Sequence, residues 1–246
     1  MPKLIQCVAA IVLLAGFSNV VLGQSDAKSE MPVMGKTTAL FDGSNLDHWR
    51  GYRTETIGIG WQIQEDGSLM FDGGAEKGHG GDLVTKDVYS DFVLTFKWKV
   101  SAGANSGVIY RVGLGDKAPY FTGPEYQVID DVSMKNNHNP KTAAGAIYGL
   151  YEATGKKLNA VGEWNSAKIV LKGNNVQHWL NGVKVVNAEM YSDDWNKQVA
   201  ASKFSKWDKF ATLKSGHIAF QDHGNQVWYR DIVIVDLGGP KSETDK

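Results

Sequence analysis

The residues that could do chemistry lie on two strand-like runs between Asn105 and Asp130 of the sequence. The second run, residues 125–130, reads Glu-Tyr-Gln-Val-Ile-Asp and carries polar side chains at Glu125, Gln127 and Asp130. Side chains alternate between the two faces of a strand, so Glu125 and Gln127 point to the same side. A polar side chain in an apolar strand is either paired within the fold or used by it.

Other polar side chains could join Glu125 and Gln127. Arg111 lies in the first of the two runs, residues 108–112, and Gln221 and His223 share a face of a segment near the end of the chain. If these faces coincide, one concave side of a bent sheet carries an arginine, a carboxylate, amides and an imidazole. Such a groove suits a sugar, whose hydroxyls need both donors and acceptors. The same residues also have structural explanations: Arg111 and Glu125 could form a cross-strand ion pair, and His223 could simply end a strand.

No familiar catalytic motif accompanies these residues. The sequence holds no nucleotide-binding glycine loop, no HExxH, no G-x-S-x-G and no CxxC. Asp130, Asp131 and His138 could bind a cation, but their spacing matches no pattern of metal ligands. We therefore expect neither a metal nor another cofactor.

The elements around these residues are predicted to be strands. In residues 91–100 every second side chain is apolar, which predicts a strand with one dry and one wet face. Residues 65–67 and Asn181-Gly182 each lie between two such runs and predict hairpin turns. Residues 146–151 are also expected to form a strand. About a dozen such runs, without βα alternation, predict an all-β, two-sheet antiparallel sandwich.

Residues 191–211 differ from the rest of the domain. Trp195, Val199 and Trp207 recur at multiples of four, and lysines and serines fill many of the other positions. This spacing predicts one or two short amphipathic helices on the sandwich edge, with Asp193 as a candidate cap. We expect the tryptophans of this segment to pack against the sandwich and not to bind a ligand.

The two ends of the chain are unlike this domain. Residues 1–23 have a positively charged start, a mostly apolar stretch and small residues at the end, which is typical of a cleaved secretory signal. Residues 24–38 are predicted to be a flexible linker, 39–238 the folded domain, and 239–246 a polar tail. We therefore expect an exported bacterial protein, periplasmic or extracellular, with no stable membrane span after cleavage.

Charge and cysteine content narrow the function classes further. Removal of residues 1–23 leaves a net charge of −2, because the formal charge of −1 includes Lys3, and it also removes Cys7, the only cysteine. The mature fold is then held by its core, without disulfides. The near-neutral charge and the lack of a basic stripe argue against a nucleic-acid partner.

Nine short motifs occur in one order between positions 39 and 237. They are Leu40-Phe41-Asp42-Gly43 with Trp49; Asp91-Phe92; Asn105-Ser106-Gly107 with Arg111; Glu125-Tyr126-Gln127-Val128-Ile129-Asp130; Gly145-Ala146-Ile147-Tyr148; Gly162-Glu163-Trp164-Asn165; Trp179-Leu180-Asn181-Gly182; Gln221-Asp222-His223-Gly224; and Arg230-Asp231-Ile232. In this set and order the chain resembles the 3-keto-disaccharide hydrolase family of secreted bacterial proteins. The family commonly has Asn where this chain has Asp231.

The resemblance implies a fold and a substrate class. The fold would be a concanavalin A-like jelly roll, which is shared by many lectins and glucanases. The substrate would be a glycoside whose sugar carries a ketone at carbon 3, and an upstream sugar oxidoreductase could supply it. A ketone at carbon 3 makes the carbon-2 proton acidic, so a base can start an elimination that expels the group at carbon 1, after which water adds.

The resemblance also marks candidate site residues at matching motif positions. His223 and Glu125 are the candidates for base and acid, and Asp130 is a further acid candidate. Arg111 and Gln127 would hold the enolate oxygen or orient the sugar. Further candidates for substrate binding are Asn105, Tyr148, Gln221 and Trp164.

Three other functions remain open from the sequence. The same groove could bind glycan without cleaving it, as a carbohydrate-binding module does. An ordinary glucanase is a second option, but glucanases of this fold usually carry acids at alternate positions of one strand, and Glu125 is followed by Gln127. A purely structural sandwich is the third.

Overall fold

The structure is a computed structural model that describes residues 35–74, 79–133 and 139–239. The chain divides into two units, Met1–Pro32 and Val33–Lys246, and all described residues belong to the second. The predicted signal peptide and His138 therefore lie outside the described residues. Within the described part of the chain, no helix has the length and apolar character needed to cross a membrane.

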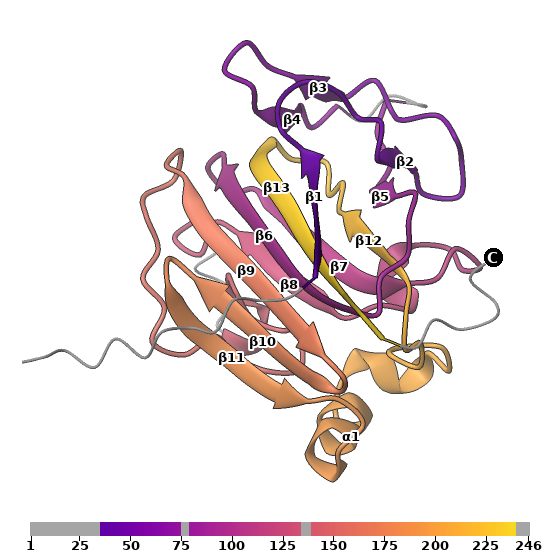
Figure 1. The fold of residues 1–246 in the computed structure, drawn as a ribbon. Helices are drawn as coiled ribbons and strands as arrows, with labels where there is room; N and C mark the ends of the chain where they lie inside the picture. The colour runs from indigo at the N-terminus through magenta and orange to yellow at the C-terminus, as the bar shows by residue number, and fades with distance from the viewer. Residues whose placement is uncertain (1–34, 75–78, 134–138, 240–246) are drawn as a thin grey trace, which may run out of the picture. The chain divides into compact units, whose positions relative to one another are not determined.

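The larger of two sheets has eight strands (Figure 1). Its order is β11-β10-β9-β6-β13-β4-β3, and β1 pairs with β13 beside this path. The strands are β1 (Lys36–Phe41), β3 (Trp61–Ile63), β4 (Leu69–Phe71), β6 (Asp91–Val100), β9 (Asn165–Lys172), β10 (Asn175–Leu180), β11 (Val183–Glu189) and β13 (Val227–Gly238). β1 starts inside the predicted linker, because its residues pair along β13 from Lys36 onward.

The smaller sheet has five strands in the order β2-β5-β12-β7-β8. They are β2 (Trp49–Gly51), β5 (Leu83–Thr85), β7 (Asn105–Val112), β8 (Glu125–Ile129) and β12 (His217–Phe220). Every pairing in both sheets is antiparallel. The predicted two-sheet antiparallel sandwich is confirmed.

The hydrophobic core lies between the two sheets. The alternate apolar side chains of β6 are buried, as the sequence pattern predicts. Phe96 of β6 meets Tyr126 of β8 at 5.6 Å and Phe220 of β12 at 5.7 Å between ring centroids. Because these inner faces are filled, Glu125 and Gln127, which alternate with Tyr126 on β8, are directed to the other side of the smaller sheet.

The helical segments are short and lie outside the sheets. They are α1 (Asp193–Ala200) and the 3₁₀ helices η1 (Pro119–Phe121), η2 (Pro140–Thr142) and η3 (Lys203–Lys206). The predicted helical segment is confirmed, but the cap of α1 is Ser192, whose Oγ accepts a hydrogen bond from the Trp195 amide at 3.1 Å, and not Asp193.

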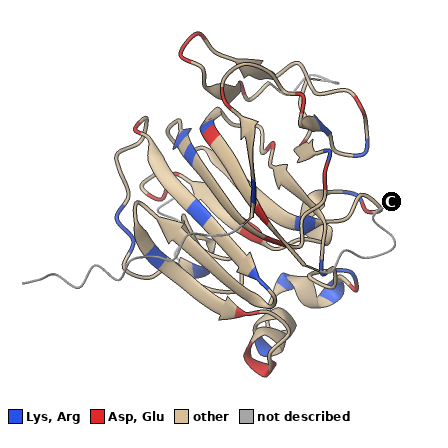
Figure 2. Cartoon of the chain, in the orientation of Figure 1, with Lys and Arg blue, Asp and Glu red and all other residues tan. Residues whose placement is uncertain are grey.

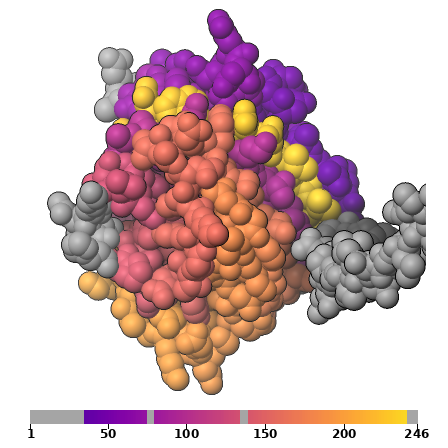
Figure 3. Space-filling view, turned by 90° about the vertical axis from the view of Figure 1, so that its left-hand side faces the viewer, coloured from indigo at the N-terminus to yellow at the C-terminus, as the bar shows by residue number. Residues whose placement is uncertain are grey.

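The strand predicted at residues 146–151 does not form. Gly145, Ala146 and Tyr148 instead exchange hydrogen bonds with the backbone of β8, and only isolated bridges pair Ile147 with Tyr126 and Tyr151. This segment covers the free edge of β8. Figure 3 shows the surface where the segments that follow β8 (pink) meet the β9–β11 region (orange). Below the surface, one contact between them is a hydrogen bond of 3.0 Å between His178 Nδ1 and Gly145 O.

Candidate active site

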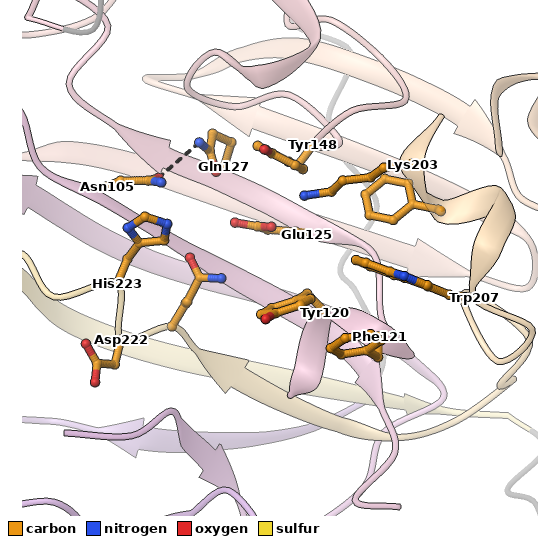
Figure 4. A pocket seen from close by; sticks show the side chains of 12 residues that line it. Asn105, Tyr120, Phe121, Glu125, Gln127, Tyr148, Lys203, Trp207, Asp222 and His223 are labelled. Atoms are coloured by element: carbon orange, nitrogen blue, oxygen red, sulfur yellow. Dashed lines mark hydrogen bonds between the residues drawn. The ribbon is translucent and has the colours of Figure 1, made fainter. Parts of the chain in front are cut away.

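A pocket of about 480 Å³ opens over the smaller sheet, on the side away from the core (Figure 4). Strands β7 and β8, the corner after β12, η1, η3 and the turn before Tyr151 build it. Its lining consists of Asn105, Tyr120, Phe121, Glu125, Gln127, Tyr148, Lys203, Phe204, Trp207, Gln221, Asp222 and His223. Six of the nine residues proposed from the sequence are in this set.

Glu125 begins β8 and lies on the floor of the pocket. Its carboxyl group extends across β7 above Gly107, where a Cβ atom would overlap Oε1 and approach Cδ at 2.7 Å. Only glycine leaves room for this close approach. The Asn105-Ser106-Gly107 motif thus positions the carboxyl group, because Gly107 provides the space that it occupies.

Burial dominates the chemistry of Glu125. The residue is 8% exposed, and within the described residues no group donates a hydrogen bond to its carboxylate. Desolvation raises the pKa of Glu125 to about 8; the positive charge of Lys203 lowers it, and the negative charge of Asp82 raises it, by smaller amounts. A carboxyl group with a pKa near the working pH is suited to general acid–base catalysis.

Gln127 and Asn105 form an amide pair beside the carboxyl group. Gln127 Nε2 donates a hydrogen bond to Asn105 Oδ1 at 3.1 Å (Figure 4). Gln127 Oε1 is buried and has no partner among the described residues. An unpaired buried acceptor costs free energy unless a ligand satisfies it. The pair is therefore ready to accept a hydrogen bond from a substrate hydroxyl.

The corner after β12 places Gln221 and His223 at the pocket. Asp222 shapes this corner: its Oδ1 accepts a hydrogen bond from Gly224 N and its Oδ2 one from Gly81 N, both at 2.8 Å. The Gln221 side chain is buried, whereas His223 is exposed at the mouth. Both candidates thus reach the same space as Glu125.

Tyr148 and Lys203 continue the side of the pocket that Gln127 begins (Figure 4). The Tyr148 amide donates to Glu125 O at 3.0 Å, which fixes the tyrosine beside the carboxyl group. The Lys203 ammonium lies 4.4 Å from the centre of the Tyr148 ring. Although the predicted strand at Tyr148 does not form, the residue does reach the pocket.

Aromatic rings from η1 and from the helical segment close the remaining side. Trp207 lies 4.4 Å from Phe121 and 5.8 Å from Tyr120 between ring centroids, and all three rings are partly exposed to the pocket. The expectation that the tryptophans of this segment only pack holds for Trp195, which is 2% exposed. Trp207 also packs against the core cluster, and in addition its ring lines the pocket.

Arg111 does not reach the pocket, because a β-bulge reverses its direction. β12 residues His217 and Ala219 pair with Val112 and Ile109, so β7 holds one extra residue there. Arg111 takes the left-handed conformation, with φ of 54°, and Val112 instead continues the outward face.

The buried guanidinium of Arg111 bonds elsewhere. It donates to Gly173 O at 2.8 Å and to Tyr191 Oη at 3.1 Å. The cross-strand ion pair with Glu125, which the sequence left open as an alternative, is also absent from the described ion pairs. Arg111 is thus a structural residue.

Asp130 follows β8 and also lies outside the pocket. Its Oδ2 accepts from Gly103 N at 2.8 Å, and its Oδ1 accepts from Val132 N at 2.9 Å and Ser133 N at 3.2 Å. Burial alone would raise the pKa of Asp130, but these hydrogen bonds outweigh it and lower the pKa. A carboxylate held in this way is a poor proton donor.

The possible cation site at Asp130 and Asp131 has no support in the described residues. Asp131 pairs with Lys156 Nζ at 2.5 Å, and no group of three or more His, Cys, Asp or Glu side chains within the described ranges could hold a metal ion.

Trp164 lies on the other sheet. It directly precedes β9 and packs against Lys99, 4.9 Å from its ring centre, and Arg230, 4.2 Å away. These cations belong to β6 and β13, whose strands carry several of the basic positions in Figure 2. Trp164 therefore cannot bind a substrate in this pocket.

Sequence reasoning missed several residues that line the pocket. They are Tyr120, Phe121, Lys203, Phe204, Trp207 and Asp222. The adjacent aromatics after Pro119 were one available signal, because two large rings in a loop need a surface to cover. Lys203 carried no signal, since a lysine in a helical segment rich in lysines is usually solvated.

With this geometry in place, comparison with known proteins decides the family. Residues 36–235 match the 3-keto-alpha-glucoside-1,2-lyase-like domain. The chain belongs to this family. A 3-keto-disaccharide hydrolase of Bacteroides thetaiotaomicron is 35% identical over 224 residues, which cover 79% of this chain and 76% of that protein. The predicted family is confirmed, and with it the prediction of an enzyme that acts on glycosidic bonds.

Solved structures agree with this assignment. A protein of Parabacteroides distasonis, described as a candidate glycosyl hydrolase, is 33% identical with a TM-score of 0.73, covering 82% of this chain and 94% of that one. A Bacillus subtilis protein with a galectin-like fold is 14% identical with a TM-score of 0.50, over 82% and 94% of the two chains. This second likeness concerns the fold alone and supports the β-sandwich class.

Proposed function

We propose that this protein cleaves the glycosidic bond of 3-keto-glycosides, including 3-keto-disaccharides, in the pocket around Glu125. The observation that carries the proposal is the Glu125 carboxyl group itself. It is buried, lacks a hydrogen-bond donor among the described residues, and has a pKa raised to about 8 by desolvation. A purely structural carboxylate would instead be paired, as Asp130 is. The names of the relatives supply the substrate class.

Glu125 is the base in the mechanism that we propose. Its carboxylate takes the proton from carbon 2, and the electron pair of that C–H bond forms a double bond to carbon 3, so that the ketone becomes an enolate. The enolate then collapses: the ketone re-forms, a double bond forms between carbons 1 and 2, and the bond from carbon 1 to the leaving oxygen breaks. Desolvation makes the carboxylate a stronger base for this weak carbon acid.

His223 gives the leaving oxygen its proton in this scheme, because it lies at the mouth of the pocket where that oxygen would depart. Water then adds across the double bond between carbons 1 and 2 and yields the free keto-sugar. Such a route needs only one basic carboxylate. The ordinary route through an oxocarbenium ion needs two, and the oxygens of Asp222, the other carboxylate in the pocket, already accept backbone hydrogen bonds.

The remaining pocket residues would hold the substrate. Gln127 Oε1 has no partner among the described residues and would accept a hydrogen bond from a sugar hydroxyl, with Asn105 and Gln221 beside it. Trp207 and Tyr120 offer flat apolar faces on which a sugar ring or other leaving group can stack. The pocket thus offers both polar groups and flat aromatic faces to a glycoside.

Two further parts of the proposal concern cellular context. The substrate requires that a secondary alcohol at carbon 3 has been oxidised, so an upstream sugar oxidoreductase is part of the proposal. The sequence of residues 1–23 supports export of the protein to the periplasm or the exterior.

Product analysis in deuterated water tests this function. The purified protein receives a disaccharide and its 3-keto form side by side, and products are followed by mass spectrometry and NMR. We expect cleavage of the keto form alone, with deuterium at carbon 2. Cleavage of the plain sugar would indicate an ordinary glycosidase, and binding without cleavage of either would indicate a carbohydrate-binding module.

A further inference from the structure

Lys203 is set apart from the other described cations by its position at the pocket and not by the lack of an ion pair, which most of them share. Among the described residues it is the only lysine or arginine that lines the pocket, and no acidic side chain there forms an ion pair with it. Elsewhere Lys97 pairs with Asp231 at 2.9 Å and Lys156 with Asp131 at 2.5 Å. A positive charge left without a counter-ion inside a ligand pocket indicates that the ligand supplies negative charge at some stage.

The position of Lys203 is fixed by its neighbours. Ser202 caps η3, with its Oγ accepting from Phe204 N at 3.1 Å, and the buried Phe204 ring stacks on Phe210 at 4.0 Å between centroids. The Lys203 side chain then crosses the Tyr148 ring, with its ammonium 4.4 Å from the ring centre. Lys203 is exposed, but its side chain thereby lies against the Tyr148 ring at the pocket.

The ammonium and the Glu125 carboxyl group face the same space. Figure 4 shows Lys203 extending from η3 toward Glu125, with Tyr148 on one side. The charge of Lys203 lowers the pKa of Glu125, so the two groups interact electrostatically. They do not form an ion pair among the described residues, and the pocket between them leaves room for an oxygen atom of a bound sugar.

We propose that Lys203 binds the oxygen on carbon 3 of the keto-sugar and stabilises the negative charge that develops there when Glu125 removes the carbon-2 proton. This inference rests on the proposed function. In the step concerned, the C–H bond at carbon 2 breaks, its proton goes to Glu125, and the carbonyl electron pair moves onto the carbon-3 oxygen. The substrate is neutral and the enolate is an anion, so the ammonium stabilises the transition state more than the bound substrate.

Two other roles for Lys203 make different predictions. If Lys203 bound an acidic group that is already present on the substrate, its loss would raise KM and leave kcat nearly unchanged. If Lys203 only packed against Tyr148, any long side chain would serve and the charge would be irrelevant. The role at the enolate predicts loss of kcat that the charge-retaining arginine largely restores.

Steady-state kinetics on a neutral 3-keto-disaccharide separate these roles. The variants are Lys203→Met, which keeps length and packing, Lys203→Arg, which keeps the charge, and Lys206→Met as a control on the same 3₁₀ helix but outside the pocket. We expect Lys203→Met to lower kcat by about 10²- to 10³-fold with little change in KM. Lys203→Arg should recover most of this loss, and Lys206→Met should match the wild type.

A second readout isolates the proton-transfer step. The rate at which deuterium enters carbon 2 from deuterated water should fall in Lys203→Met in proportion to kcat. The same circular dichroism spectrum and melting temperature as in Lys206→Met would show that folding is intact. Normal kcat and exchange in a folded Lys203→Met protein would overturn the role of Lys203 and leave the proposed function standing. No turnover of the keto-sugar by the wild-type protein would overturn both.

Discussion

Two carboxylates of one sequence motif lie at the two ends of strand β8, and the structure gives them different surroundings. Glu125 starts the strand and lies buried on the pocket floor without a hydrogen-bond donor among the described residues, and its pKa is raised to about 8. Asp130 follows the strand and accepts three backbone hydrogen bonds, from Gly103, Val132 and Ser133, which lower its pKa.

The difference separates a chemical role from a structural one. The hydrogen bonds of Asp130 stabilise its charged form and hold the turn that follows β8. Glu125 has no such bonds among the described residues, so its carboxylate is available to take a proton from a substrate. The hydrogen-bond donors around each carboxylate thus indicate which of the two has a structural role and which is available for chemistry.

The largest expected effect is the loss of activity in Glu125→Gln. The amide keeps the shape of the side chain but cannot take a proton, so kcat on a 3-keto-disaccharide should fall by about 10²- to 10⁴-fold. The matched variant Asp130→Asn should keep kcat close to the wild-type value in the fraction that folds. Initial rates, corrected for folded protein, measure both. Equal losses in the two variants would remove the distinction between the two ends of β8.

The next effect concerns Gly107, over which the Glu125 carboxyl group lies. In Gly107→Ala the new methyl group would overlap Oε1, so the carboxyl group must move. A displacement of about 1 Å at a catalytic group costs on the order of 10²-fold in rate, and we expect a loss of that size. The control is Gly115→Ala, where a Cβ atom meets nothing within 4 Å. Normal kcat in a well-folded Gly107→Ala protein would contradict the close approach.

For the free energy of unfolding, we expect the larger loss at Asp130 and not at Glu125. Asp130→Ala leaves the three backbone amides of the turn without their acceptor, and the free energy of unfolding should fall by about 1–3 kcal/mol. Glu125→Gln replaces a buried, unpaired acid by a neutral group and should not destabilise the fold. Urea denaturation of both variants measures this. A Glu125→Gln protein that is less stable than Asp130→Ala would show that the carboxyl group of Glu125 is structural.

A graded effect, about tenfold per pH unit, is expected in the pH dependence of activity. The pKa of Glu125 is raised to about 8. Below pH 8, its carboxylate fraction, and with it kcat/KM, should therefore rise by about tenfold per pH unit, and above pH 8 both should level off. Lys203 lowers the pKa of Glu125 and Asp82 raises it, both by smaller amounts than desolvation does. A rate that is flat from pH 6 to 9 would exclude Glu125 as the base.

The pKa shifts of Glu125 and Asp130 also predict how the free energy of unfolding depends on pH, with opposite signs for the two residues. The folded state holds the Glu125 proton more tightly than the unfolded state, whose pKa lies near the ordinary 4.5. Its contribution to stability is thus fully present below that value and is lost as pH rises toward 8. The pKa of Asp130 is lowered, so its contribution is present above the ordinary value and is lost as pH falls. Unfolding free energies of the two variants across pH, compared with wild type, should show these opposite slopes.

Local patterns were sufficient to predict most of the fold. Strict alternation predicts β6, and Asn181-Gly182 forms the expected hairpin turn, with φ of 48° and 80°. The shared face of Glu125 and Gln127 also follows from alternation. Each of these depends only on neighbours in sequence, which is why the sequence alone predicts them.

The errors arose where one residue changed the direction of a side chain or where distant segments met. A single bulge turned Arg111 away from the face that alternation predicts. Trp164 lies in one of the nine sequence motifs but packs on the other sheet. Lys203 and Trp207 reach the pocket from a helical segment that is distant in sequence from β7 and β8. Bulges and long-range contacts leave little trace in a single sequence.

The most direct test of the account is the rate of deuterium entry at carbon 2 of a 3-keto-glycoside in deuterated water. It is measured at one pH for the wild-type protein, Glu125→Gln and Asp130→Asn. The account predicts rapid exchange in the wild type and Asp130→Asn, and exchange reduced by about 10² or more in Glu125→Gln. Wild-type exchange in Glu125→Gln would contradict the claim that this buried carboxyl group removes the proton.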